Sequence, residues 1–442
     1  MARHNYLNLY IFISILSTSA SAFSIDTEKI NRILTLNEIE SVTLSQSLDI
    51  KSKEFEAAAA QDKSDALPSN LIPKLTLEGS YKFLSEIPEL NIFPGRVLKF
   101  GDNKNYSIGP TLTMTILDFN TKSHLQTSLE KNVSAKKNEV ISQKSNTLFK
   151  TRYHYINLAF LLEKRAMIAN SLKVANKQLK DVTNKQRFGS GSKLDLLTAQ
   201  KEVHELESQF KEISFNIATE QTELFKVSFY QKIREANFES DQNFLESLAF
   251  IKNRFLSYKN RKYKIEDSSK IRTLKDQSDS LESQAISISS QRLPKVNFYA
   301  RTSLDYPNGP DLSQFNQNSI GVTLSMPLFD GGEISHNVSE KNNQAMALRY
   351  QASNEERNFI ESIQLIMKRI DNLSEQNEII QKKIIESNEI SKLVYNSYQE
   401  GRATFIEVER ANVKSREAIL NLSSNEYQIT LNLIQLANIA GE

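Results

Sequence analysis

The stretch SIGVTLSMPLFDGG at residues 319–332 repeats, 212 positions later, the pattern of SIGPTLTMTILDFN at residues 107–120. Ser-Ile-Gly, Thr-Leu, a Met and an Asp fall at matching places in the two stretches. Both alternate apolar and polar side chains over about ten residues, the period of two that gives a β-strand two unlike faces. The chain therefore contains the same kind of strand twice, and Asp118 and Asp330 mark matching points near the ends of the two copies.

The positions of proline and glycine predict where helices lie. All nine prolines fall in two windows, residues 68–110 and 294–327, and proline cannot continue the interior of a helix. Residues 121–188 and 333–400 contain neither proline nor glycine, and each stretch has 68 residues. A helix of that length extends about 100 Å. We predict one long helix over each stretch and non-helical structure in the two proline windows.

A shorter helix is expected after each long one, at residues 192–229 and 404–440, beyond a turn that contains glycine. Apolar residues recur every seven positions in both, namely Leu196, Val203, Phe210, Ile217 and Leu224 in the first and Ile406, Val413, Leu420, Tyr427 and Ile434 in the second. This spacing is typical of helices that pack side by side as coiled coils. A rod-like structural coiled coil would show the same spacing, but it has no use for the two proline windows.

Each proline window predicts a β-hairpin, at about residues 72–117 and 293–329, and the first hairpin has the longer loop. A soluble β-sandwich would show the same alternation. Strands of about ten residues are, however, what a tilted strand needs to cross a bilayer. Their polar faces carry Thr, Ser, Asn, Lys and Arg, which suits a water-filled lumen. We therefore favour membrane-spanning strands over a sandwich.

The alternation also predicts which side chains face lipid. Leu112 and Leu324 lie on the apolar faces of their strands and should face lipid, whereas Thr111 and Thr323 should face a lumen. Four strands leave two open edges, which lipid does not tolerate, and closed bacterial barrels begin at about eight strands. One chain cannot close a barrel, so we expect it to oligomerise.

The first 22 residues have the pattern of a secretory signal peptide. A basic start is followed by an apolar stretch at residues 7–16 and by Ala-Ser-Ala at residues 20–22, which suits a cleavage site. The alternative is a transmembrane anchor, but this apolar stretch is too short to cross about 30 Å of hydrocarbon as a helix. We expect residues 1–22 to be removed and the mature protein to leave the cytoplasm.

The composition argues against several classes of function. The chain has 442 residues, 24% of them charged, and a formal net charge of +2, whereas a nucleic-acid binder should be clearly basic. It has no cysteine, which excludes disulfides, cysteine metal sites and thiol catalysis. The five histidines are scattered, and GSGSK at residues 189–193 lacks the spacing of a phosphate-binding loop. We expect no enzyme activity, no cofactor, no metal and no nucleic-acid partner.

The interval of 212 residues returns outside the strands, at Gly189 and Gly401, at Asp195 and Glu407, and at Ala199 and Ala411. We infer a tandem repeat with units at residues 23–240 and 241–442, each in the order helix, hairpin, long helix, turn, helix. This order resembles the TolC-like outer membrane efflux protein family over essentially the whole mature chain. The segments that carry the resemblance most specifically are LPKVNFYARTSLDY, IGVTLSMPLFDGG and YNSYQEGRATFIEVERA.

The resemblance implies a fold and a function. The fold is mainly α with membrane β: a homotrimer in which each copy gives four strands to one twelve-stranded barrel in the outer membrane, while coiled-coil helices form a periplasmic α-barrel. The function is passive export of substrates delivered by a periplasmic adaptor (membrane fusion) protein and an inner-membrane pump of the RND or ABC type. A periplasmic adaptor-like protein and a secreted structural coiled coil are the alternatives. An adaptor would normally have one helical hairpin, whereas this chain has two.

The resemblance also implies two sets of residues at the periplasmic tip, where the glycine turns meet. The first set matches the turns on which the family docks its adaptor, and consists of Gly189, Gly191, Gly401 and Thr404. The second set would close the tip as a gate, and consists of Asp195, Tyr398, Arg402, Glu407 and Arg187. Its arginines are included because they lie close in sequence to the matching tyrosine and acidic residues. Ordinary solvated charges at a helix turn are the alternative interpretation.

Overall fold

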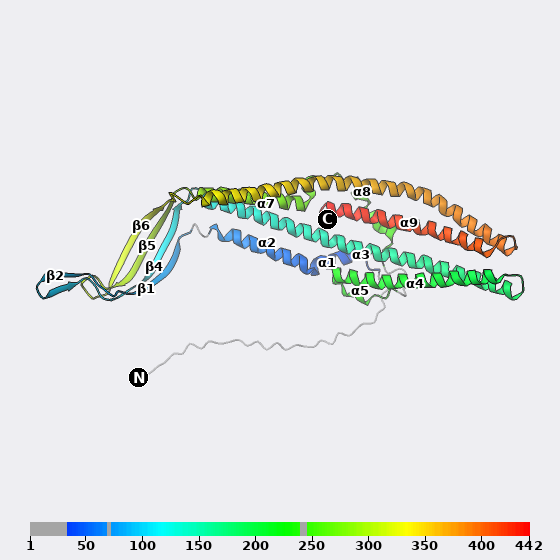
Figure 1. Ribbon diagram of the computed structural model, residues 1–442, viewed down its shortest axis with the longest axis horizontal. Helices are drawn as coiled ribbons and strands as arrows, with labels where there is room; N and C mark the ends of the chain where they lie inside the picture. Colours follow the sequence, from blue (N-terminus) through cyan, green and yellow to red (C-terminus); the bar gives the residue numbers. More distant parts are fainter. Residues whose placement is uncertain (1–32, 69–71, 239–244) are drawn as a thin grey trace, which may run out of the picture.

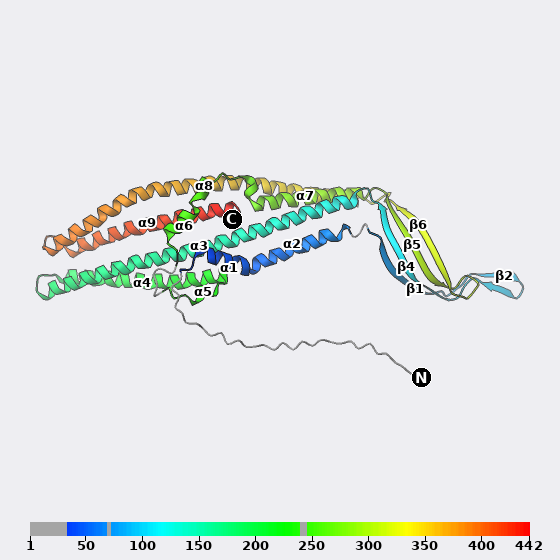
Figure 2. The same ribbon diagram turned by 180° about the vertical axis from the view of Figure 1, so that it is seen from behind.

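The molecule is elongated, with a β-sheet at one end and long helices running away from it (Figure 1). The computed structural model describes residues 33–68, 72–238 and 245–442. The predicted signal peptide at residues 1–22 lies outside the described residues. Seen from behind, the helices again run along the long axis, and the two turns that connect helices at the end opposite the sheet again lie close together (Figure 2).

Two helices of 67 residues run the length of the helical part, α3 (Thr121–Arg187) and α8 (Glu333–Gln399). Each packs against one shorter helix near the sheet and another toward the far end: α2 (Leu48–Ala66) and α4 (Lys193–Ser228) along α3, and α7 (Ser269–Ser290) and α9 (Phe405–Ile439) along α8. Because α3 also packs against α7 and α9, it joins the two halves of the chain. The ten heptad residues of α4 and α9 are all buried or half-buried, as coiled-coil packing requires.

The main hydrophobic core lies midway along the helices, where short elements pack against α3, α4, α7 and α9. These are α1 (Leu36–Gln46), α5 (Gln231–Glu235), α6 (Leu248–Phe255) and the 3-10 helices η2 (Leu256–Asn260) and η3 (Ile265–Asp267). Tyr155 of α3 is fully buried and donates its hydroxyl to the Leu34 carbonyl at 2.7 Å. Glu40 accepts hydrogen bonds from Arg152 at 2.6 Å and from Arg254 at 2.7 Å. Tyr155 and Arg152 thus fasten the α1 segment to α3, and Glu40 in turn joins α1 to α6.

The sheet has four antiparallel strands in the order β1-β4-β5-β6, so β1 and β6 are its edges. The strands are β1 (Lys74–Phe83), β4 (Lys104–Leu117), β5 (Lys295–Tyr306) and β6 (Phe315–Ser325). Between β1 and β4, a separate ribbon of β2 (Glu89–Phe93) and β3 (Arg96–Lys99) extends beyond the sheet, away from the helices (Figure 1). The longer loop expected in the first hairpin is therefore a β-ribbon. Within the described ranges, no helix is both long and apolar enough to cross a bilayer.

One face of the sheet is apolar and uncovered. Leu75 lies opposite Leu112, which in turn lies opposite Ala300, so apolar side chains align across three strands. Leu75 is 71% exposed and Leu324 is 67% exposed. A contiguous apolar surface of this kind requires lipid or protein to cover it. It is the face that the sequence predicts to lie against lipid.

The opposite face carries a network of polar side chains. The Ser107 hydroxyl donates to Asp305 at 2.5 Å and accepts from Arg301 at 2.9 Å. Arg301 also lies 3.8 Å from Glu78, whose carboxylate accepts from the Thr111 hydroxyl at 3.2 Å. Thr111 is buried by these neighbours. The network spans β1, β4 and β5, so it holds the strands together on the side predicted to line the lumen.

The glycine of the repeated Ser-Ile-Gly motif is needed for close packing on this polar face. A Cβ at Gly109 would lie 2.0 Å from the Thr302 carbonyl oxygen, so β4 and β5 could not approach as they do. A Cβ at Gly321 would lie 2.6 Å from the ring of Tyr299, which crosses the glycine from the neighbouring strand. Both copies of the motif therefore keep glycine because a neighbouring strand fills the space of a side chain.

Each copy of the strand turns into its long helix through two residues with positive φ. In the second half these are Gly331 (φ 63°) and Gly332 (φ 90°), and in the first half they are Phe119 (φ 48°) and Asn120 (φ 65°). The matching aspartates cap the helices: Asp118 accepts from the Lys122 backbone N–H at 3.2 Å, and Asp330 accepts from two backbone N–H groups at 3.0 Å. The two turns thus have the same geometry, built from different residues.

The polarity of β6 can be tested with one arginine placed on either face. We expect Leu324→Arg to impair assembly, because an arginine on the lipid face of a strand costs free energy, about 2–4 kcal/mol at the bilayer midplane and less toward the end of β6, where Leu324 lies. Thr323→Arg places the same side chain on the polar face and should assemble like the parent. The measurement is the yield of assembled protein in isolated outer membranes. Equal yields for the two variants would contradict the assigned faces.

Candidate functional site

The end of the molecule farthest from the sheet consists of two short turns that lie side by side (Figure 1). One turn joins α3 to α4 and the other joins α8 to α9. Gly189 and Gly401 take the same left-handed conformation, with φ of 75° and 76°. Behind each glycine the chain closes on its long helix in the same way: Ser190 donates its N–H to the Lys185 carbonyl at 2.9 Å, and Arg402 donates to the Ser397 carbonyl at 2.8 Å. Both are glycine-terminated helix ends of the Schellman type.

The glycine at 191 has a different role from the one at 189. Its φ is not positive, but an added Cβ would lie 2.8 Å from the backbone nitrogen of Gln186. The turn that follows α3 therefore folds back on the helix so closely that a side chain at 191 would collide with it. Ser192 then caps α4, because its hydroxyl accepts from the Asp195 N–H at 3.0 Å.

Polar contacts across the tip connect the α3–α4 pair to the α8–α9 pair. Lys185 of α3 donates to the carbonyl of Tyr398 at 2.9 Å and its ammonium lies over the Tyr398 ring, 4.4 Å from the centroid. The Tyr395 hydroxyl donates to Asp181 at 2.6 Å. Asp195 accepts from the backbone N–H of Phe405 at 3.3 Å. Of the gate residues predicted from sequence, Asp195 and Tyr398 take part in these contacts.

Tyr398 acts mainly through its ring. It is 5% exposed and its ring packs edge-on against Phe405, with centroids 5.4 Å apart. Val182, Ala199 and Val408 complete a small apolar cluster shared by all four helices. The Tyr398 hydroxyl has no hydrogen-bond partner among the described residues. Burial raises the pKa of Tyr398, and the charges of two nearby aspartates raise it further, so it stays neutral.

The other three gate candidates do not cross the tip within this chain. Glu407 accepts from the N–H of Thr404 at 2.7 Å and from its hydroxyl at 3.0 Å, forming a capping box at the start of α9. Both bonds lower the pKa of the Glu407 carboxyl, and the bond from the Thr404 backbone N–H has the larger effect. Arg402 is exposed and pairs with Glu400 in its own turn at 2.9 Å. Arg187 is exposed, and no described residue forms an ion pair with it.

Sequence reasoning missed Asp181, Lys185 and Tyr395. On a polar helix these residues look like solvated side chains, and their partners lie 213 or 214 positions away. The repeat itself was a signal for these contacts, because residues that face one another across the two turns of the tip are separated by about one repeat length.

Above the tip, a buried ion pair joins the same two helix pairs. Arg416 of α9 lies 2.9 Å from Glu202 of α4, and both side chains are largely buried. Asn412 donates to Gln178 at 3.0 Å beside them. These residues line a cavity of about 440 Å³. Burial raises the pKa of the Glu202 carboxyl, and the neighbouring arginine only partly offsets this effect.

The family model of outer membrane efflux proteins matches residues 41–228 and 265–442, which is most of the chain. The chain belongs to the outer membrane efflux protein family. The resemblance noted in the sequence is thereby confirmed, as are the fold class of long helices with a membrane β domain and the location in the outer membrane with a periplasmic helical part. Proteins of this family are channels rather than enzymes, and the outer membrane efflux protein described here has a role in efflux.

Solved structures agree on the fold of this efflux protein. The outer membrane protein VceC from Vibrio cholerae has 15% identity and a TM-score of 0.76, over 92% of this chain and 96% of that one. The CmeC outer membrane channel from Campylobacter jejuni has 14% identity and a TM-score of 0.72, over 92% and 85% of the two chains. The open state of the MtrE channel from Neisseria gonorrhoeae has 12% identity and a TM-score of 0.70, over 92% and 88%. No curated protein sequence matches the chain.

The contact between Tyr395 and Asp181 can be tested by removing one hydroxyl. We expect Tyr395→Phe to favour separation of the helix pairs about ten- to a hundredfold, because a hydrogen bond to a charged group contributes about 1.5–3 kcal/mol. Single-channel recording in a planar bilayer should then show more time in conducting states. Tyr350→Phe, which alters an exposed tyrosine of the same helix, is the matched control. Identical traces for parent and Tyr395→Phe would exclude this bond from the closure of the tip.

The buried Glu202 predicts a pH dependence whose sign follows from the raised pKa. When the helix pairs separate, the carboxyl becomes exposed and its pKa returns toward 4.5. The arrangement in the structure, in which the two helix pairs are in contact, therefore binds the proton more tightly, and it gains stability as the pH falls through the raised pKa toward 4.5. We expect fewer openings at pH 5 than at pH 7.

The control for this prediction compares two glutamates of α4. Glu202→Gln imitates the protonated group, so it should open less at pH 7 and lose most of the pH response, whereas the exposed Glu207→Gln should behave like the parent. The groups whose charges act on Glu202 are Arg416, Glu409 and Glu205. A parent channel that opens more readily in acid would show that the ion pair, rather than burial, dominates.

Proposed function

We propose that three copies of this chain form one channel-tunnel whose β-barrel has no open edges. This channel-tunnel passively exports substrates across the periplasm and outer membrane. The observation that carries this proposal is that β1 and β6 each have one edge without a neighbouring strand among the described residues, in a sheet with an exposed apolar face. Backbone groups at these edges need partners in lipid. Pairing β6 of one copy with β1 of the next satisfies both edges, and three copies give an even number of strands around a lumen.

The outermost helices of the helical part also suit contact with the neighbouring copy of the chain. Near the sheet, α2, α3, α7 and α8 pack in that order, and toward the tip α4 takes the place of α2 and α9 takes the place of α7. α8 exposes large apolar side chains along its length, among them Ile379, Ile385 and Leu393, while α2 and α4 expose Phe55 and Phe215. Exposed apolar surface of this extent is typical of an interaction site. We propose that α8 of one copy covers α2 and α4 of the next.

The tip contacts would act as the gate of this channel. Opening requires the α8–α9 pair to move away from the α3–α4 pair, which breaks the bonds of Asp181, Lys185 and Asp195. A few such bonds are strong enough to hold one state and weak enough for a partner to shift the balance, since a few kcal/mol changes which state dominates. Arg187 and Arg402 are exposed and make no cross-tip ion pair with any described residue, so we assign them to contacts between copies.

We propose that the tip is also where the periplasmic adaptor docks. Beside Gly189 and Gly191, the side chains of Phe188 and Leu194 are 81% and 60% exposed, and Leu197 is exposed one turn further on. The turn at Gly401 and Thr404 presents Glu400 where the first turn presents Phe188. The two turns therefore offer an adaptor unequal surfaces, and the α3–α4 turn supplies the apolar one. The inner-membrane pump, of RND or ABC type, delivers the substrate.

The trimer can be tested by measuring the mass of the purified protein in detergent by light scattering. We expect three times the mass of the mature chain. Ile379→Asp combined with Ile385→Asp should reduce the trimer fraction strongly, because it places charges in the proposed contact between copies. A monomeric parent protein would overturn the closed-channel proposal.

A further inference from the structure

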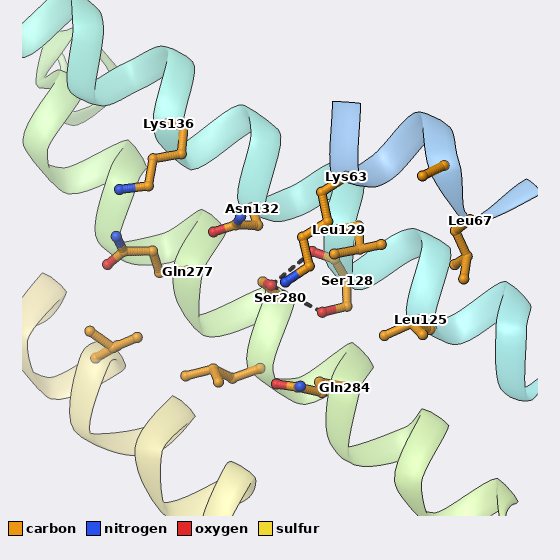
Figure 3. A pocket seen from close by; sticks show the side chains of 13 residues that line it. Lys63, Leu67, Leu125, Ser128, Leu129, Asn132, Lys136, Gln277, Ser280 and Gln284 are labelled. Carbon is orange, nitrogen blue, oxygen red and sulfur yellow. Dashed lines mark hydrogen bonds between the residues drawn. The ribbon is translucent and has the colours of Figure 1, made fainter. Parts of the chain in front are cut away.

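A cavity of about 630 Å³ lies in the helical part near the sheet, between α2, α3, α7 and α8 (Figure 3). Its lining includes Leu125, the fifth residue of α3, about 6 Å along the helix axis from Thr121, where β4 has just ended. The cavity therefore lies beside the inner face of the outer membrane. Its volume falls within the range of about 300–1,000 Å³ that small-molecule sites occupy.

The lining combines apolar side chains with hydrogen-bond donors. The apolar members are Ala66, Leu67, Leu125, Leu129, Leu281 and Leu348. The uncharged polar members are Ser128, Asn132, Gln277, Ser280 and Gln284, and the charged members are Lys63 and Lys136. No aspartate or glutamate is among the described residues that line the cavity. The cavity is thus apolar in part and positively charged.

The two lysines differ in how their charge is balanced. The Lys136 ammonium lies 2.9 Å from Glu139, so a carboxylate outside the cavity already neutralises it. Lys63 forms no ion pair with any described residue. Its side chain points into the cavity toward Ser128 and Ser280 (Figure 3). These two serines bond each other, with the Ser280 hydroxyl 2.7 Å from the Ser128 carbonyl, so they hold α3 and α7 together beneath the ammonium.

We propose that this cavity binds an anionic amphiphile, with its carboxylate or phosphate at Lys63 and its alkyl chain against Leu125, Leu129 and Leu281. An ammonium attracts an anion, and the amide of Asn132 adds a donor beside it. The leucines exclude water along the rest of the cavity. Two sources share this chemistry: an anionic phospholipid of the adjacent membrane leaflet, and a fatty-acid-like molecule on its way through the channel. The proposal concerns a ligand of the channel wall and does not depend on how the tip opens.

The test uses full-length protein in nanodiscs of phosphatidylcholine and a photoreactive dodecanoate. We expect covalent labelling of peptides that contain residues 125–129 or 281–284. Lys63→Gln should weaken dodecanoate binding about fivefold, because one lysine near an anionic lipid contributes about 1 kcal/mol and 1.4 kcal/mol is tenfold in affinity. Lys51→Gln, which alters an exposed lysine earlier in the same helix, is the matched control and should label like the parent.

Two further arms separate charge from apolar contact and lipid from free ligand. The uncharged photoreactive dodecanol should label the parent and Lys63→Gln equally. If phosphatidylglycerol in the nanodisc blocks dodecanoate labelling, the ligand is a lipid; if it does not, the ligand is the free amphiphile. Labelling of Lys63→Gln as strong as that of the parent, or labelling of the parent only outside the cavity, would overturn the proposal. The mass and conductance of Lys63→Gln should equal those of the parent, so the result is independent of the trimer and the gate.

Discussion

Backbone groups at the edge of a lipid-facing sheet have no water to bind, and the architecture of this chain follows from that constraint. The two edge strands are also the strands that lead to the edges of the helical layer, because β1 follows α2 and β6 leads into α8. A neighbour that pairs with the sheet therefore meets the helices at the same side. The exposed apolar side chains of α8, α2 and α4 lie where that neighbour would cover them. The need to pair strand edges in the membrane therefore also determines which helices face a neighbour along the periplasmic part of the molecule.

Much of this architecture was predictable because the physical signals are local. Where proline and glycine are absent for 68 residues, nothing stops a helix, and α3 and α8 end within one residue of the expected positions. The strands follow from a period of two that only an extended chain can use. The β2–β3 ribbon could not be predicted in the same way, because strands of four and five residues between Pro88 and Gly101 are too short to show a period.

The candidate site was harder to predict because its bonds join residues a whole repeat apart. A charged residue on a polar helix carries no sign of whether it faces water or a partner, so Asp181 and Lys185 were missed. Glu407 illustrates the opposite case. Its spacing from Thr404 is that of a capping box, and this local bond explains its position, with or without a role in the gate. Tyr398 was predicted from its place in the turn pattern, and in the structure its ring rather than its hydroxyl makes the contact.

The unlike turns between strand and helix give the two halves of the chain unequal stiffness. Gly331 and Gly332 can take many combinations of φ and ψ, whereas Phe119 in the left-handed region has few alternatives. The turn between β6 and α8 therefore bends more easily than the turn between β4 and α3. Each helix is a lever of about 100 Å, so a rotation of one degree at its joint moves the far end by about 2 Å. A small bend at Gly331 and Gly332 that leaves the sheet undisturbed would therefore be enough to move Tyr395 out of hydrogen-bond distance of Asp181.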